Sequence, residues 1–137
     1  MSYSNLRVLV VDDMSIMRTI LKALLNNMGV TDIIEASNGE MALETLKQNK
    51  VDLILSDWNM PKMTGIELLR RIREDILLQN IPFVMISAEA TKENISRAIH
   101  LHVNQYLVKP VSAAQLEQKV SPLLAGIAGS TAKQVAA

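Results

Sequence analysis

Aspartates stand at the ends of two short apolar segments, and they are the first candidates for chemistry in this sequence. Asp12 and Asp13 follow the segment 6–11, and Asp57 follows the segment 51–56. If these segments are neighbouring strands of a parallel sheet, their carboxyl ends meet at one edge and the three carboxylates converge. Carboxylates held together repel one another, which raises a pKa or attracts a hard divalent cation such as Mg²⁺.

A serine and a lysine belong to the same predicted edge. Ser87 ends the apolar segment that starts at Pro82, and Lys109 follows the segment 105–108. A hydroxyl, a cation and a bound Mg²⁺ facing a carboxylate nucleophile supply the positioning and charge neutralisation that phosphoryl transfer requires. Taken singly, an Asp or Ser here caps a helix or starts a turn, and a Lys is simply solvated. Their occurrence together favours the functional interpretation.

Two alternating hydrophobic patterns predict the elements that position these residues. Short runs rich in Val, Ile and Leu predict five strands, at 6–11, 33–36, 51–56, 82–87 and 105–108. Helical spacing separates them, with core-facing stripes predicted at Met17, Ile20, Leu21, Leu24 and Met28 and at Ile66, Leu69 and Ile72. Alternating strands and helices with right-handed crossovers predict an α/β fold, an open doubly wound parallel sheet.

Helix start signals agree with this pattern. Asn38 and Thr91 are candidate N-caps, and capping-box spacing occurs between Thr64 and Glu67 and between Ser112 and Gln115. In such a sheet the ligand site lies beyond the carboxyl ends of the strands. The predicted fold therefore directs attention to the edge that carries the aspartates.

The composition narrows the classes of protein to which the chain belongs. Its 137 residues fit one domain, and 14 Lys and Arg balance 14 Asp and Glu, which argues against binding to nucleic acid or a membrane surface. The lack of cysteine excludes disulfides and a thiolate metal site. With no signal peptide and no long apolar run, we expect a cytoplasmic protein. We assign residues 1–124 to the domain and expect a flexible tail or the start of a linker at 125–137.

Four motifs carry a resemblance to a known family: Val-Asp-Asp at 11–13, Ser-Asp-Trp-Asn-Met-Pro at 56–61, Ser-Ala-Glu-Ala at 87–90 and Tyr-Leu-Val-Lys-Pro at 106–110. Over residues 6–124 the chain resembles the receiver domain of response regulators in two-component signalling, and it looks most like the CheY-type chemotaxis regulators. The resemblance implies a flavodoxin-like sheet of five parallel strands in the order 2-1-3-4-5, with five helices.

The resemblance also implies a role for each acidic residue. Asp57 would take a phosphoryl group from a phosphohistidine on a sensor histidine kinase. Asp13 and Asp57 would bind Mg²⁺ directly, Asp12 would bind it through water, and the backbone carbonyl of Asn59 would complete the protein ligands. Such a domain is not an enzyme in the usual sense, because it catalyses only its own phosphorylation and dephosphorylation.

Further residues would handle the phosphoryl group and signal its presence. Lys109 and Ser87 would bind phosphoryl oxygens, with help from the backbone N–H groups of Trp58 and Ala88. When Ser87 moves toward the phosphate, Tyr106 would turn inward.

Two positions beside the site, Asn59 and Glu89, would tune how fast the acyl phosphate is hydrolysed. The downstream partner would be a protein, for which the flagellar motor switch is the candidate.

Two local conformations are expected from the family pattern. Receivers usually have a cis peptide at the junction that corresponds to Lys109–Pro110, so we expect one here. Residues 101–105 replace a stretch rich in Gly and Ala, in which glycine normally supplies the left-handed residue that ends the preceding helix. His102 or Asn104 must therefore end that helix in another way.

Alternative functions stay open on the sequence alone. A flavodoxin-like electron carrier shares the sheet but needs a phosphate-binding loop rich in Gly and hydroxyls, where this chain has residues 12–15, Asp-Asp-Met-Ser. A phosphatase of the haloacid dehalogenase type also uses an Asp nucleophile, but it needs an Asp-x-Asp motif after its first strand, and that motif is missing here. The nearer alternative is a receiver from a larger regulator, or one that serves a phosphorelay instead of chemotaxis.

Overall fold

A computed structural model describes the backbone of residues 3–136 and the side chains of residues 3–129. The strands are β1 (Arg7–Val11), β2 (Asp32–Ala36), β3 (Leu53–Asp57), β4 (Phe83–Ser87) and β5 (Gln105–Val108). The helices are α1 (Ser15–Asn27), α2 (Gly39–Gln48), α3 (Gly65–Glu74), α4 (Lys92–His100) and α5 (Ala113–Ala136). The five predicted strands are all present, with small shifts at their ends.

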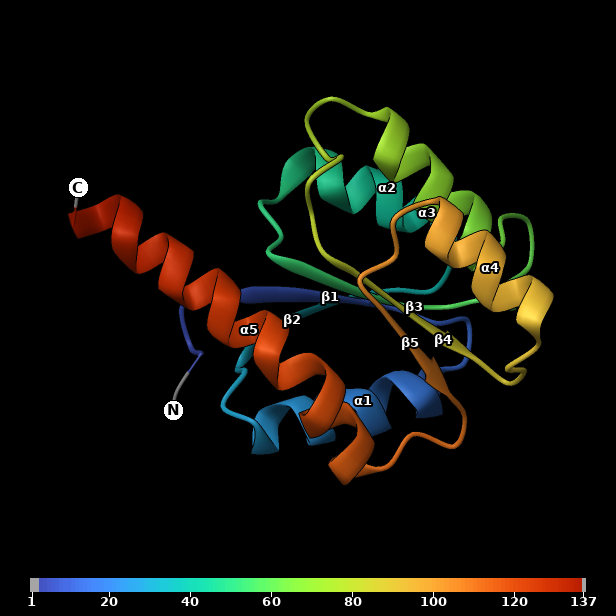
Figure 1. Ribbon diagram of the computed structural model, residues 1–137, viewed down its shortest axis with the longest axis horizontal. Coiled ribbons are helices and arrows are strands. Elements are labelled where there is room, and N and C mark those ends of the chain that lie inside the picture. Colours follow the sequence, from blue (N-terminus) through green and yellow to red (C-terminus); the bar gives the residue numbers. More distant parts are fainter. Residues whose placement is uncertain (1–2, 137) are drawn as a thin grey trace.

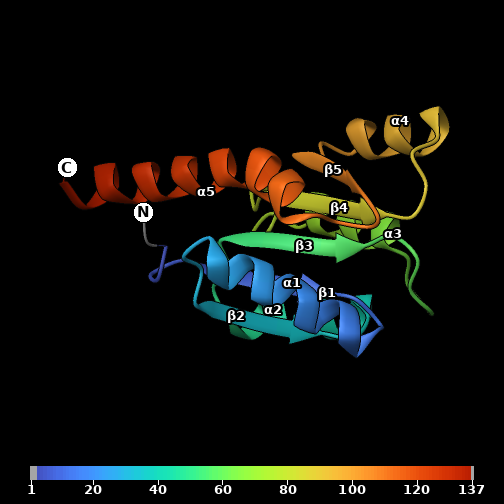
Figure 2. The same ribbon diagram turned by 90° about the horizontal axis from the view of Figure 1, so that it is seen from below.

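All strand pairs are parallel, and the strands follow the order β2-β1-β3-β4-β5. This confirms the doubly wound α/β fold and the flavodoxin-like strand order. Helices α1 and α5 cover one face of the sheet, and α2, α3 and α4 cover the other (Figures 1 and 2). Every residue of β3 and β4 is buried, as expected for central strands that are covered on both faces.

The sheet separates two apolar cores, and β1 contributes to both because its side chains alternate between faces. Leu9 and Val11 pack with residues of α2, α3 and α4. Val8 and Val10 pack with residues of α1 and α5. The strand that leads into the two aspartates is therefore fixed from both sides.

Side-chain caps begin the helices where the sequence predicts them. Asn38, Thr64, Thr91 and Ser112 each accept a hydrogen bond from the backbone N–H three residues later. The predicted apolar stripe of α1 is wrong for Ile20, which is 43% exposed. Leu21, the next member of the predicted stripe, is buried as expected, because α1 contacts the sheet along that side.

At the end of α4, a histidine takes the left-handed position that glycine normally occupies in the family. His102 adopts φ 62°, in the left-handed region. Its N–H donates to Ile99 O at 2.9 Å, and the N–H of Val103 donates to Ala98 O at 3.0 Å, the Schellman pattern. The guanidinium of Arg73 donates to the His102 carbonyl and so holds this turn.

The last helix differs from the expected tail, because α5 continues from Leu124 through residue 136. Ile127 and Ala128 pack against the same core as Val120 and Leu124, so they extend the apolar side of the helix. Residue 137 lies outside the described residues, and the domain boundary at Leu124 stays a prediction. Within the described chain, no helix combines the length and apolar character that a membrane span requires.

Candidate functional site

The three predicted carboxylates meet at the carboxyl edge of the sheet. In the β1–β3 ladder Val11 lies opposite Ser56, so Asp12 and Asp57 emerge side by side. One oxygen from each of Asp12, Asp13 and Asp57 lies within 4.8 Å of the others. Asp12 and Asp57 are buried and Asp13 is exposed, so the cluster is open on one side.

Asp12 also fulfils the ordinary structural role considered for it. Its Oδ1 accepts a hydrogen bond from the Met14 N–H at 2.9 Å, and its own N–H donates to Ala36 O at 3.1 Å. The loop between β1 and α1 is thus fixed to itself and to β2. A turn-forming aspartate and an acidic-site residue are the same residue here.

Asp57 is held beneath the start of α3 by a close backbone approach. A Cβ atom on Gly65 would lie 2.2 Å from the Asp57 carbonyl oxygen, so no other residue fits at this position without a shift of the backbone. The Gly65 N–H donates to Trp58 O at 2.8 Å. Gly65 is a residue of the site that the sequence arguments missed.

Lys109 supplies the cation of the site. Its Nζ lies 3.1 Å from Asp57 Oδ1 and 3.6 Å from Asp12 Oδ2. Its backbone N–H donates to Ser87 O at 2.8 Å, which carries the β4–β5 ladder into the site. The Lys109–Pro110 peptide is cis, as predicted.

The pKa values reflect a buried and incompletely neutralised cluster. Burial raises the pKa of Asp57 above its ordinary value; the hydrogen bond from Lys109 offsets this in part, and the charge of Asp12 raises it further. Burial would lower the pKa of Lys109, but its hydrogen bond to Asp57 and the charges of Asp57 and Asp12 raise it on balance. An additional cation would therefore stabilise the charged form of Asp57.

The donor set fits Mg²⁺, since three carboxylates offer hard oxygen ligands and the open side leaves room for water. Asp13 is the member best placed to change partners. Within the described residues, its carboxylate takes part in no hydrogen bond or ion pair. The Asn59 backbone lies beside the cluster, where its N–H lowers the pKa of Asp57.

Ser87 and Tyr106, the two predicted switch residues, are connected through the backbone of Glu89. The buried Ser87 Oγ accepts a hydrogen bond from the Glu89 N–H at 3.1 Å. The Tyr106 hydroxyl donates to the Glu89 carbonyl at 2.7 Å. A movement of Ser87 toward Asp57 would therefore release a loop to which Tyr106 is bound.

Trp58 lies between Tyr106 and α4. Its ring and that of Tyr106 meet edge to face at a centroid distance of 6.4 Å, and the Arg97 guanidinium lies 5.5 Å from its ring centroid. The Trp58 N–H, which the family resemblance assigned to phosphoryl binding, donates to Ile86 O at 2.9 Å. In this structure it is committed to the sheet, and the Asn59 N–H faces Asp57 instead.

Comparisons with known proteins agree with the geometry. The sequence profile of the response regulator receiver domain matches residues 8–121. The chemotaxis protein CheY-3 of Vibrio cholerae is 45% identical over 119 residues, which cover 87% of this chain and 92% of that protein. The chemotaxis protein CheY of Pseudomonas aeruginosa is 42% identical over 124 residues, which cover 90% of this chain and 100% of that protein.

Solved structures give the same result. The chemotaxis protein CheY4 of Vibrio cholerae superposes with a TM-score of 0.80 at 28% identity, covering 86% of this chain and 98% of that one. The receiver domain of the Francisella response regulator 1452 superposes with a TM-score of 0.79 at 32% identity, covering 88% of this chain and 97% of that one.

Proposed function

Because the chain belongs to the response regulator receiver domain family, we propose that Asp57 accepts a phosphoryl group from a sensor histidine kinase and that the domain passes this signal to a downstream protein. The observation that carries the proposal is the cluster at the carboxyl edge. Three carboxylates lie within 4.8 Å of one another, and Lys109 Nζ lies 3.1 Å from the proposed acceptor oxygen.

In the proposed reaction, a carboxylate oxygen of Asp57 attacks the phosphorus of a phosphohistidine. A P–O bond forms, the P–N bond breaks, and the histidine leaves as neutral imidazole after taking up a proton. Lys109 binds a phosphoryl oxygen and neutralises its charge. Asp12, Asp13, Asp57 and the backbone carbonyl of Asn59 would hold Mg²⁺, which when bound neutralises further charge on the phosphoryl group.

Hydrolysis of the proposed aspartyl phosphate returns the domain to its starting state. Water attacks the phosphorus, the bond to Asp57 breaks, and inorganic phosphate leaves, so the protein catalyses only its own phosphorylation and dephosphorylation. Asn59 and Glu89 are both exposed; the Asn59 N–H faces Asp57 and the Glu89 N–H donates to Ser87 Oγ, which suits a role in controlling the approach of that water.

Ser87 and Tyr106 would convert phosphorylation into a change of conformation. When Ser87 moves to donate its O–H to a phosphoryl oxygen, its Oγ moves away from the Glu89 N–H, and the loop that Tyr106 contacts is free to rearrange. Tyr106 then turns inward and changes the surface beside α4. Since the two curated relatives are chemotaxis proteins, we assign this output to chemotaxis, with the flagellar motor switch as the candidate target.

Phosphorylation is tested by incubating the protein with Mg²⁺ and acetyl phosphate and measuring its intact mass. The expected result is the addition of one phosphoryl group, which requires Mg²⁺ and is absent in Asp57→Asn, because an amide is a much weaker nucleophile than a carboxylate. Asp32→Asn is the matched control, since Asp32 begins β2 at the opposite edge of the sheet. Stable phosphorylation of Asp57→Asn would assign the acceptor role to another residue.

The output is tested separately by affinity capture from flagellated cells with phosphorylated and unphosphorylated protein. Capture of a motor-switch protein only by the phosphorylated form supports the chemotaxis role. Capture of a histidine-containing phosphotransfer protein would instead assign the chain to a phosphorelay.

A further inference from the structure

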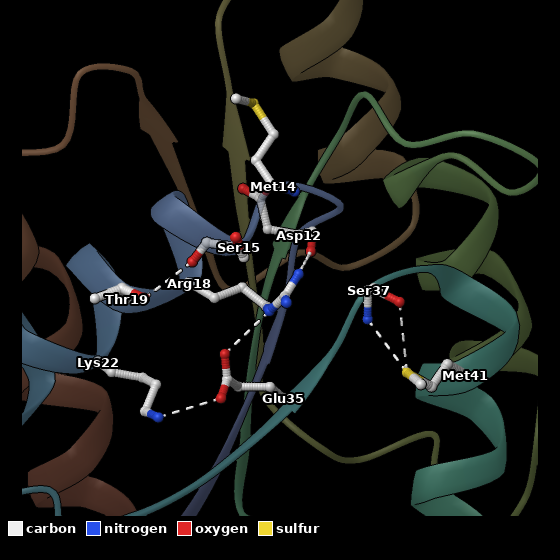
Figure 3. A network of polar contacts seen from close by, with 9 residues as sticks. All are labelled: Asp12, Met14, Ser15, Arg18, Thr19, Lys22, Glu35, Ser37 and Met41. Atoms are coloured by element: carbon white, nitrogen blue, oxygen red, sulfur yellow. Dashed lines mark hydrogen bonds and ion pairs between the residues drawn. The ribbon is translucent and has the colours of Figure 1, made fainter.

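A chain of charged side chains outside the site contacts the loop that carries its acidic pair. Arg18, on α1, donates from Nη1 to the backbone carbonyl of Asp12 at 2.6 Å (Figure 3). Its side chain is only 17% exposed. The contact joins α1 to the turn that leads from β1 into the site, six residues earlier in the sequence.

The geometry of the peptide bond explains why this contact matters for the next residue. The Asp12 carbonyl and the Asp13 N–H belong to one planar peptide unit. A hydrogen bond that fixes this carbonyl therefore also fixes the Asp13 N–H and Cα, from which, together with the φ angle of Asp13, the direction of its side chain follows. Since no partner holds the Asp13 carboxylate within the described residues, the orientation of its backbone sets the region that the carboxylate reaches through its side-chain rotamers.

Arg18 is itself held by an acid on the edge strand. Its Nε lies 3.0 Å from Glu35 Oε1, and Lys22 Nζ lies 3.2 Å from the other carboxylate oxygen, Glu35 Oε2. The hydrogen bond from Lys22, followed by that from Arg18, keeps the pKa of Glu35 below its ordinary value despite some burial. Glu35 thus stays charged, orients the guanidinium and offsets its positive charge.

We propose that Arg18, oriented by Glu35, is a positioning residue for the metal site that sets the direction of Asp13 through the Asp12 carbonyl. The inference rests on the proposed role of Asp12, Asp13 and Asp57 in binding Mg²⁺. Arg18 contacts neither the metal nor the phosphoryl group.

Two effects of Arg18 on Mg²⁺ binding have opposite signs, which makes the proposal testable. A cation near a metal site repels the metal, so removing Arg18 strengthens Mg²⁺ binding if only its charge matters. Removing it weakens Mg²⁺ binding if it orients a ligand. Residues that orient metal ligands typically change affinity by about 10- to 100-fold when they are removed.

The experiment measures Mg²⁺ affinity by titration calorimetry and by the fluorescence of Trp58, the single tryptophan of the chain. We expect Arg18→Ala to weaken Mg²⁺ binding about tenfold. Lys22→Ala is the matched control, because it removes the same charge from the same Glu35 carboxylate but leaves the bond to Asp12. We expect it to change the affinity less than about twofold.

Tighter binding by Arg18→Ala, or an equal loss in both variants, would overturn the inference while leaving the proposed function intact. If the wild-type protein does not bind Mg²⁺, the proposed function fails, and the inference fails with it. Arg18→Met keeps the aliphatic stem and removes only the donors. It therefore replaces Arg18→Ala if thermal unfolding in EDTA shows that the alanine variant does not fold.

Discussion

The acidic edge, with Asp12, Asp13 and Asp57, and the switch side, with Ser87, Tyr106 and α4, are held in very different ways, although they share one sheet. At the acidic edge, Asp12 takes part in contacts with Met14, Ala36, Arg18 and Lys109. On the switch side, α4 buries a single residue, Ala98, whereas α3 buries five. Few buried contacts mean low local stability, which is typical of elements that move. The proposed chemistry is thus placed on the rigid part and its proposed readout on the loosely held part.

The largest expected effect comes from breaking the rigid edge at Gly65. In Gly65→Ala the new Cβ meets the Asp57 backbone, which cannot yield, so we expect a loss of about 3 kcal/mol in the free energy of unfolding. Gly39→Ala is the matched control. Its Cβ meets the side chain of Met63, which can change rotamer, so about 1 kcal/mol is expected.

Denaturant unfolding without Mg²⁺ measures both variants. Equal losses in the two glycine variants would show that the approach of α3 to Asp57 is no tighter than an ordinary helix contact.

A second prediction concerns the charge that the rigid edge holds. Burial raises the pKa of Asp57 above its ordinary value of 3.8. As the pH rises past 3.8, the folded state therefore keeps a proton that the unfolded state loses. At neutral pH the ionised Asp57 carboxylate thus destabilises the metal-free protein. We expect Asp57→Asn to stabilise the metal-free protein by on the order of 1 kcal/mol at pH 7.

The pH dependence gives the sign check for this second prediction. Well below pH 3.8 the carboxyl is protonated in both states, so the advantage of Asp57→Asn should vanish there. Thermal unfolding in EDTA across this range measures it. An advantage that grows as the pH falls would contradict the assigned direction of the pKa shift.

A third prediction sharpens the other side of the comparison, at the end of α4. His102 occupies the left-handed region at φ 62°, where a side chain costs about 1 kcal/mol relative to glycine. We expect His102→Gly to raise the free energy of unfolding by somewhat less than this, because glycine also gains freedom in the unfolded chain. His102→Ala keeps a Cβ and should give no gain. If alanine stabilises as much as glycine, backbone strain is not the cause.

The sequence alone predicted the acidic edge better than it predicted the contacts that fix the edge in place. Asp12, Asp13 and Asp57 could be placed together because the ends of neighbouring parallel strands meet, a consequence of strand direction alone. The contact of Arg18 with Asp12 depends on how α1 turns back over its own loop, and no sequence spacing encodes that. Similarly, Ile20 has helical spacing but lies at the flank of α1.

The C-terminal helix shows the same limit from another direction. A segment rich in Ala and Gly suits either a helix or a coil, and the packing of Ile127 against the core favours the helix. Such a contact becomes visible only when the whole core is assembled.

The smallest expected effect tests whether the two sides can be perturbed independently. Arg97 lies on α4 with its guanidinium 5.5 Å from the Trp58 ring centroid, an exposed cation–π contact worth about 0.5–1 kcal/mol. Arg97→Ala should lower the free energy of unfolding by about 0.5 kcal/mol and alter Trp58 emission, because the indole loses its cover. Lys92→Ala removes the same charge from the first residue of α4 and should leave the emission unchanged.

Mg²⁺ affinity, measured by calorimetry, should be the same in both variants and in the wild type, since neither residue contacts the acidic cluster. If Arg97→Ala weakens Mg²⁺ binding as much as Arg18→Ala does, the stack on Trp58 supports the acidic edge as well, and the rigid and mobile sides are one unit.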